Sequence, residues 1–112
     1  MLEIVTRTQD KVAIIEIKGE VDLYSSPEVR KAILSFTKIK APALIVDLSR
    51  VSYMDSSGVA TLVEGLQLTG EYGGQFKLVS PGPTVREVFE LSRLDRIFDI
   101  YSNLSQALEG SK

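Results

Sequence analysis

The chain has 112 residues, of which 44% are apolar and 25% are charged, a balance typical of a soluble globular domain. It contains no cysteine and no histidine, which excludes disulfides, zinc–thiolate sites, thiol catalysis and the commonest general base. Its 13 basic and 15 acidic residues give a net charge of −2, so electrostatic attraction favours neither nucleic acid nor anionic lipid as a partner.

The N-terminal third predicts two strands followed by a helix. Residues 3–8 and 11–18 are rich in β-branched side chains, and Asp10-Lys11 forms the polar break between them. We expect Gly19 to end the second strand. A helix then begins with Ser26 as its N-cap and closes near residues 38–40, because apolar side chains recur there at helical spacing.

The middle third predicts a buried strand and a second helix. Residues 43–48 form the most apolar short run, which is typical of a strand buried on both faces. Residues 49–55 are expected to connect this strand to a helix at 56–71. We assign the apolar stripe of that helix to the core, namely Val59, Leu62, Val63 and Leu66. Leu68 lies off the stripe, where exposure would fit either an interface or an ordinary surface leucine.

The C-terminal third predicts a strand at 75–80, a helix, a short strand at 98–101 and a short helix at 103–109. The first of these helices opens with a capping box at Thr84–Glu87 and ends near Ser92. The element order is therefore ββαβαβαβα. Strands that alternate with helices pair in parallel, and the opening pair breaks this alternation. We expect an α/β fold with a mixed central sheet of four to five strands and about four helices.

We expect one cytoplasmic domain that spans residues 1–112, with its core at about 3–109. The sequence contains no linker and no internal repeat. The first residues lack the basic start and long apolar stretch of a secretory signal. No apolar run approaches the length that spans a bilayer.

Enzyme motifs are scarce in the sequence. It has neither a phosphate-binding Gly-x-x-x-x-Gly-Lys-Ser/Thr loop nor a Gly-x-Gly-x-x-Gly fingerprint. No serine stands in a Gly-x-Ser-x-Gly elbow, and there is no histidine to activate one. We therefore expect a binding protein and not an enzyme.

The most informative segment is Asp55-Ser56-Ser57-Gly58, at the start of the second helix. Loops at the carboxyl ends of strands form the usual functional edge of an open α/β sheet. A serine at a helix start lies beside N–H groups that the helix does not use, and a phosphate there suits the helix's positive end. Aspartate, serine and glycine are also good capping residues, and position alone favours plain capping.

The wider pattern resembles the STAS-domain family, the anti-sigma-factor antagonists of bacteria, over nearly the whole chain. Its strongest part is the run at 47–58, Asp-Leu-Ser-x-Val-x-Tyr-Met-Asp-Ser-Ser-Gly. Residues 19–22 match the family's Gly-Glu-(apolar)-Asp after the second strand, and Gly73-Gly74 and residues 93–98 also agree. Two motifs at matching positions, in a chain of matching length and element order, make the resemblance specific.

The resemblance implies a protein-binding switch. In the family, a partner serine kinase that is also an anti-sigma factor phosphorylates the serine directly after the aspartate, which here is Ser56. The unphosphorylated antagonist binds the anti-sigma factor and frees the sigma factor, phosphorylation breaks that complex, and a metal-dependent phosphatase restores binding. ATP and metal would belong to these partners, so the resemblance implies no cofactor, no nucleic acid and no membrane insertion for this chain.

The implied partner-binding residues are Asp22, Tyr24, Asp55, Ser56, Ser57 and Gly58. Most of them have a structural alternative. Asp22 fits capping of its own loop equally well, Asp55 fits a plain helix-terminal acid, and Tyr24 fits half-buried packing. Ser57 is a secondary phosphorylation candidate better explained by capping, and Gly58 is better explained by close backbone packing.

Two further functions remain open from the sequence: a small cytoplasmic subunit of a lipid ABC transporter, and an adaptor in another kinase–phosphatase pathway. The intact Asp55-Ser56 pair favours a phosphorylatable protein over a pure scaffold, but it does not separate the pathways. For a switch, we expect Ser56→Asp to weaken partner binding without changing the fold.

Overall fold

The computed structural model describes residues 2–110, which form a five-stranded mixed sheet and four α-helices in the predicted order ββαβαβαβα. The strands are β1 (Leu2–Gln9), β2 (Val12–Val21), β3 (Ala43–Met54), β4 (Gln75–Val79) and β5 (Asp99–Tyr101). The helices are α1 (Ser26–Thr37), α2 (Ser56–Glu71), α3 (Pro83–Leu91) and α4 (Leu104–Glu109), with a 3₁₀ turn, η1, at Leu94–Arg96. None of the helices in this part of the chain is long and apolar enough to cross a membrane.

The strands lie side by side in their chain order, β1 to β5. β1 is antiparallel to β2, and the pairs β2–β3, β3–β4 and β4–β5 are parallel, as the element order predicts. The antiparallel pair is closed by Asp10 and Lys11, whose φ angles are 51° and 69°. Two successive residues with positive φ make the hairpin turn whose twist matches the flanking strands.

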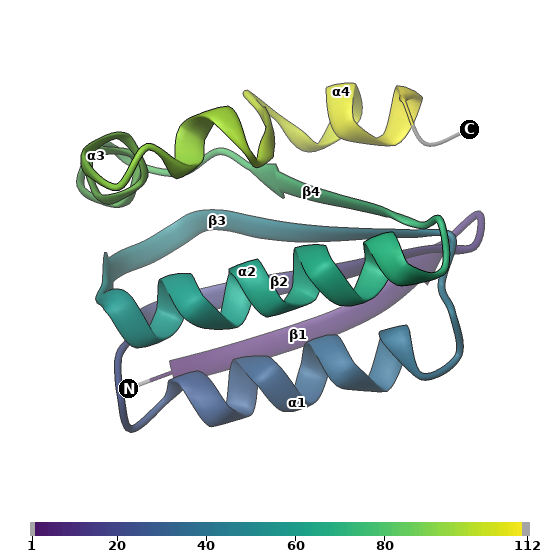
Figure 1. Ribbon diagram of the computed structural model, residues 1–112, viewed down its shortest axis with the longest axis horizontal. Coiled ribbons are helices and arrows are strands. Elements are labelled where there is room, and N and C mark those ends of the chain that lie inside the picture. Colours follow the sequence, from purple (N-terminus) through teal and green to yellow (C-terminus); the bar gives the residue numbers. More distant parts are fainter. Residues whose placement is uncertain (1, 111–112) are drawn as a thin grey trace.

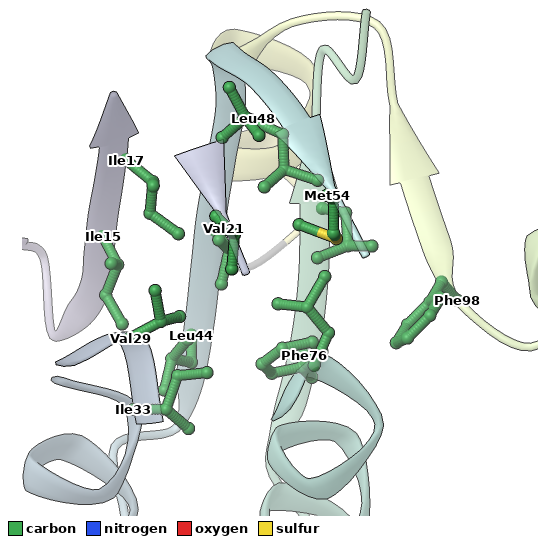
Figure 2. Packing of buried hydrophobic residues seen from close by; sticks show 14 of the residues in the cluster. Ile15, Ile17, Val21, Val29, Ile33, Leu44, Leu48, Met54, Phe76 and Phe98 are labelled. Atoms are coloured by element: carbon green, nitrogen blue, oxygen red, sulfur yellow. The ribbon is translucent and has the colours of Figure 1, made fainter. Parts of the chain in front are cut away.

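Helices α1 and α2 run side by side over one face of the sheet (Figure 1). Alternate strand residues on that face form the main core, together with Val85 and Phe89 of α3. Figure 2 shows Ile15, Leu44 and Phe76 converging on this region from neighbouring strands. A smaller cluster contains the intervening strand residues and Ala107 of α4, so α4 covers part of the opposite face.

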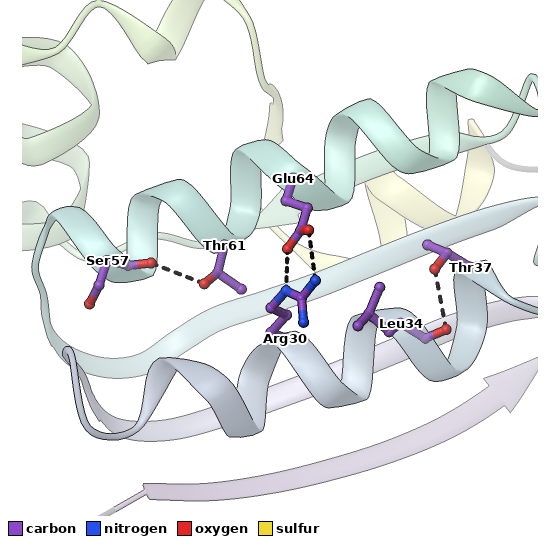
Figure 3. Close-up of polar contacts among 6 residues, drawn as sticks. All are labelled: Arg30, Leu34, Thr37, Ser57, Thr61 and Glu64. Atoms are coloured by element: carbon purple, nitrogen blue, oxygen red, sulfur yellow. Dashed lines mark hydrogen bonds and ion pairs between the residues drawn. The ribbon is translucent and has the colours of Figure 1, made fainter.

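An ion pair joins the exposed faces of α1 and α2 (Figure 3). The guanidinium of Arg30 donates from Nε and one Nη to the two carboxylate oxygens of Glu64, at 2.6 and 3.0 Å. The hydrogen bond from Arg30 lowers the pKa of Glu64. This bidentate contact links the solvent-facing sides of the two helices.

Two strands are longer than the sequence predicts. β2 does not end at Gly19 but continues to Val21. Gly19 has a φ of 117° and lies beside an irregularity in the β2–β3 register. β3 does not end at Leu48 but continues to Met54. β4 pairs with β3 only as far as Asp47, so the rest of β3 pairs with β2 alone. Polar residues are therefore tolerated in this part of the strand.

Two predicted helix starts are also wrong in detail. Ser25, not Ser26, precedes α1, and its hydroxyl bonds to Glu20 O at the end of β2 and to Asp22 instead of capping the helix. The capping box predicted at Thr84–Glu87 does not form, because α3 begins at Pro83 after Gly82 and has no side-chain cap. The predicted start at Asn103 is confirmed, since its side chain accepts a hydrogen bond from Gln106 N at 3.0 Å.

The core assignment of α2 is confirmed for Val59 and Leu62, whereas Val63, Leu66 and Leu68 are half-buried. Small residues complete the buried face of the helix: Gly58, Thr61, Gly65 and Thr69. The two threonine hydroxyls bond to backbone carbonyls of their own helix, as Figure 3 shows for Thr61. Small side chains on this face let α2 approach the sheet closely.

Candidate functional site

The candidate site forms where β2 and β3 end beside each other. Val21 and Met54 are the last residues of these strands and are register partners. The next residues, Asp22 and Asp55, therefore begin two adjacent loops at the carboxyl edge of the sheet. The backbone N–H of Asp55 donates to the carbonyl of Val21 at 3.1 Å, which fixes the loops together. Asp22 and Asp55 therefore lie at the same edge of the sheet.

Asp55 is the N-cap of α2. Its backbone is extended, and its Oδ1 accepts hydrogen bonds from Ser57 N at 2.9 Å and Gly58 N at 3.3 Å. The hydroxyl of Ser57 donates to the same oxygen at 2.5 Å. This hydroxyl is the main reason that the pKa of Asp55 is lowered; backbone N–H groups add to the effect and desolvation opposes it. The carboxylate is thus held in its charged form at the helix start.

The backbone N–H of Leu23, in the neighbouring loop, is also among the groups that lower the pKa of Asp55. Within that loop, Oδ1 of Asp22 accepts from the backbone N–H groups of Tyr24 and Ser25, both at 3.0 Å. The carbonyl of Asp22 accepts from Ser26 N at 2.8 Å. The capping role that the sequence allowed for Asp22 is therefore present, and its partner-facing role stays a prediction.

The two serines of the motif differ in availability. Ser56 is the first residue of α2 and is exposed, and no described residue hydrogen-bonds its hydroxyl. Ser57 is half-buried and its hydroxyl is committed to Asp55. The geometry thus leaves the Ser56 hydroxyl accessible and commits the Ser57 hydroxyl to the helix cap.

Gly58 is buried beneath this surface. A Cβ added there would come within 2.8 Å of both Met54 Cγ and Val21 Cγ1. Carbon atoms do not approach so closely, so only glycine lets the first turn of α2 lie on the ends of β2 and β3. The close-packing interpretation of Gly58 is confirmed, and this residue offers no side chain to a partner.

Exposed apolar side chains occur close to the site on the loop after β2 and near the end of β3. Tyr24 is 90% exposed and Leu23 is 68% exposed, so half-buried packing is wrong for Tyr24. Tyr53 is 46% exposed and is the register partner of Glu20. Leu23 and Tyr53 are surface residues that the sequence pattern did not predict. The signal available for Leu23 was a leucine inside an otherwise polar turn. Tyr53 could not be assigned to a strand surface, because residues 49–55 were predicted to be a connection.

The charges beside this apolar surface are acidic. A shallow hollow next to Tyr24 is lined by Glu20, Asp22 and Glu28 as well as Leu2. With Asp55 these carboxylates give the site a negative rim. A phosphate on Ser56 would add roughly 1.5–2 negative charges to it.

The family assignment follows from comparison with known proteins. Residues 3–107 match the model of the STAS domain, so the chain belongs to the STAS-domain family. The anti-sigma-F factor antagonist RsfB of Mycobacterium tuberculosis is 32% identical over 99 residues, which cover 88% of this chain and 80% of that protein. The anti-sigma-B factor antagonist of Staphylococcus aureus is 27% identical over 88% of this chain and 92% of its own length.

Solved structures of anti-sigma factor antagonists share the fold. One from Mycobacterium paratuberculosis is 30% identical and superposes with a TM-score of 0.91 over 99% of this chain and 94% of that chain. Unphosphorylated SpoIIAA is 26% identical with a TM-score of 0.82, over 96% of this chain and 94% of its own. The phosphorylated form of SpoIIAA from Bacillus is 24% identical with a TM-score of 0.77, over 98% of this chain and all of its own.

Proposed function

We propose that this protein is an anti-sigma factor antagonist whose binding is switched off by phosphorylation of Ser56. The observation that carries this proposal is the state of the two motif serines: Ser56 is exposed with an uncommitted hydroxyl, whereas Ser57 is bonded to Asp55. The relatives with the same fold are antagonists of anti-sigma factors, and this supports the choice of partner.

The proposed binding face comprises Ser56 and the exposed side chains of Leu23, Tyr24 and Tyr53 on the neighbouring segments. Exposed aromatic and aliphatic side chains at the centre of an acidic rim suit a protein partner with an apolar pocket and basic surroundings. Both loops that carry this face are fixed by Asp22 and Asp55, so little ordering is required when the partner binds.

Phosphorylation acts at this interface rather than on the fold. A desolvated charge without a counter-ion at an interface costs several kcal/mol, and about 3 kcal/mol lowers affinity more than a hundredfold. Interaction of the phosphate with the helix dipole contributes only about 0.3–1 kcal/mol. The interface penalty therefore dominates, and the modified protein keeps its fold but loses its partner.

The partner that fits this scheme is an anti-sigma factor that is also a serine kinase, and a metal-dependent serine phosphatase reverses the modification. ATP and the metal ion are held by these enzymes. The chain itself acts by binding and not by catalysis.

The test uses the kinase, once captured from the native cell and purified. Incubation with ATP and the wild-type chain should place one phosphate on Ser56, seen by mass spectrometry, whereas Ser56→Ala should take up none. Ser57→Ala is the matched control and should still be labelled. Ser56→Asp should bind the kinase about a hundredfold more weakly in calorimetry while its circular dichroism stays unchanged. Undiminished binding, or capture of a transporter ATPase and permease instead, would overturn the proposal.

A further inference from the structure

β1 is an edge strand with β2 on one side only, and it forms the border of the sheet in Figure 1. From Val5 to Gln9 every residue of the strand is exposed, and the apolar residue Val5 is 59% exposed. An edge strand presents a row of unpaired backbone N–H and C=O groups that can accept another strand. The opposite edge, β5, has only three residues and offers a much shorter row.

The charges of β1 are arranged symmetrically about Val5. Alternate residues of a strand share one face, so Glu3, Val5 and Arg7 point to the same side of the sheet. If a second β1 lies antiparallel with the two Val5 residues opposite each other, Glu3 of each copy stands across from Arg7 of the other. Pairings centred on Ile4 or Thr6 instead put Val5 across from Glu3 or Arg7, and both ion pairs are lost.

We propose that a second copy of this chain pairs with β1 through a two-fold axis at Val5, which joins the two sheets into one. Charges of a single sign on an edge strand would repel a second copy, whereas one acid and one base placed symmetrically attract it. Arg7 uses only part of its guanidinium within its own chain. Its Nε donates to Glu16 at 3.2 Å and one Nη contacts Gln9 at 3.4 Å, which leaves other guanidinium donors for Glu3 of the second copy.

The arrangement has consequences for strength and for the candidate site. The contact is formed by one eight-residue strand from each copy, which is small compared with the area buried in stable dimers. We therefore expect weak association, in the range of about 1–100 μM. Because the paired strands are antiparallel, the two Ser56 residues lie toward opposite ends of the joined sheet, and both stay accessible.

Charge reversal tests the predicted register. In sedimentation velocity, Glu3→Arg and Arg7→Glu should each weaken self-association by about tenfold or more, because each variant places like charges opposite one another in both pairs. An equimolar mixture of the two variants restores both opposite-charge pairs between unlike chains and should associate like the wild type. Arg7→Glu also loses the contact with Glu16, and Glu3→Arg places a second cation opposite Lys18 of its own strand pair. The mixture keeps both of these changes within the chains, so recovery of association in the mixture isolates the contact between copies.

The absence of cysteine from the sequence allows a second, direct test. Val5→Cys faces its own counterpart in the proposed register, so mild oxidation should give a covalent dimer. Thr8→Cys faces Leu2 of the other copy and should remain monomeric as the matched control. A wild-type chain that stays monomeric up to about 1 mM would overturn the proposal. So would a dimer indifferent to both charge reversals, or cross-linking of Val5→Cys no faster than that of Thr8→Cys.

Discussion

Gly58→Ala is expected to destabilise the protein and displace the start of α2, although alanine is the better helix former. The new Cβ would meet Met54 Cγ and Val21 Cγ1 at 2.8 Å and Val21 Cβ at 3.3 Å. Met54 is 2% exposed and Val21 is fully buried, so neither side chain has free space to enter. The first turn of α2 must therefore lift from the sheet.

Two opposing effects set the magnitude. Overpacking a core costs about 1–3 kcal/mol. Replacement of a helical glycine by alanine returns about 0.5–1 kcal/mol, and less in the first turn. The net loss is about 1–2 kcal/mol, and each kcal/mol lowers the melting temperature of a domain near this size by about 4–8 °C.

Gly70→Ala is the matched control, because it makes the same exchange in the same helix. No atom lies within 4 Å of the Cβ that would be added at Gly70, so only the helix-forming effect applies. This variant should be more stable than the wild type by up to about 1 kcal/mol. The assay is urea and thermal unfolding followed by circular dichroism. If Gly58→Ala proves as stable as Gly70→Ala, the close packing of α2 does not constrain this position and the reasoning is refuted.

The remaining predictions concern the helix cap, the ion pair and the C-terminal helix. The pKa of Asp55 is lowered on folding, so the stability that this residue contributes is present above about pH 4 and is lost as the pH falls through the lowered pKa. In urea unfolding across this range, the free energy of unfolding of Asp55→Asn should therefore fall less steeply with decreasing pH than that of the wild type. Glu64→Gln should cost little stability, and the cost should shrink with added salt in the same assay, because the pair with Arg30 is exposed. Lys77 is buried and its Nζ donates to Ala107 O at 3.0 Å, so Lys77→Met should speed amide hydrogen exchange in α4 while α2 remains protected.

The fold was predictable wherever local pattern and tertiary environment agree. The boundaries of the helix at 56–71 were predicted correctly, because a capping residue precedes this helix and an apolar stripe runs along it. The end of β3 was not predictable, because residues 49–53 alternate irregularly and are supported only by pairing with β2. The capping box at Thr84 failed because Pro83 already satisfies the first helical position.

The candidate site was predictable in its residues but not in its surface. Asp55 and Ser56 could be found because a helix-start motif is local in sequence. The exposure of Leu23 and Tyr24 depends on how the loop after β2 is held, and the hydrogen bond from Asp55 N to Val21 O that helps to hold it joins residues more than thirty positions apart. Contacts of that range leave no periodic pattern in the sequence, so the exposed apolar surface is seen only in the folded chain.

The occupied cap of α2 explains why a phosphate on Ser56 would act on a partner and not on this fold. A free helix start could draw the phosphate inward onto its N–H groups and reorganise the turn. Here the N–H groups of Ser57 and Gly58 already bond to Asp55, and the hydroxyl of Ser57 bonds to the same oxygen. The phosphate would also meet the negative charge of that carboxylate, so it stays on the outer surface, where Leu23 and Tyr24 are exposed. Under the proposed function, Asp55 thus keeps the fold unchanged on modification and directs the added charge to the interface.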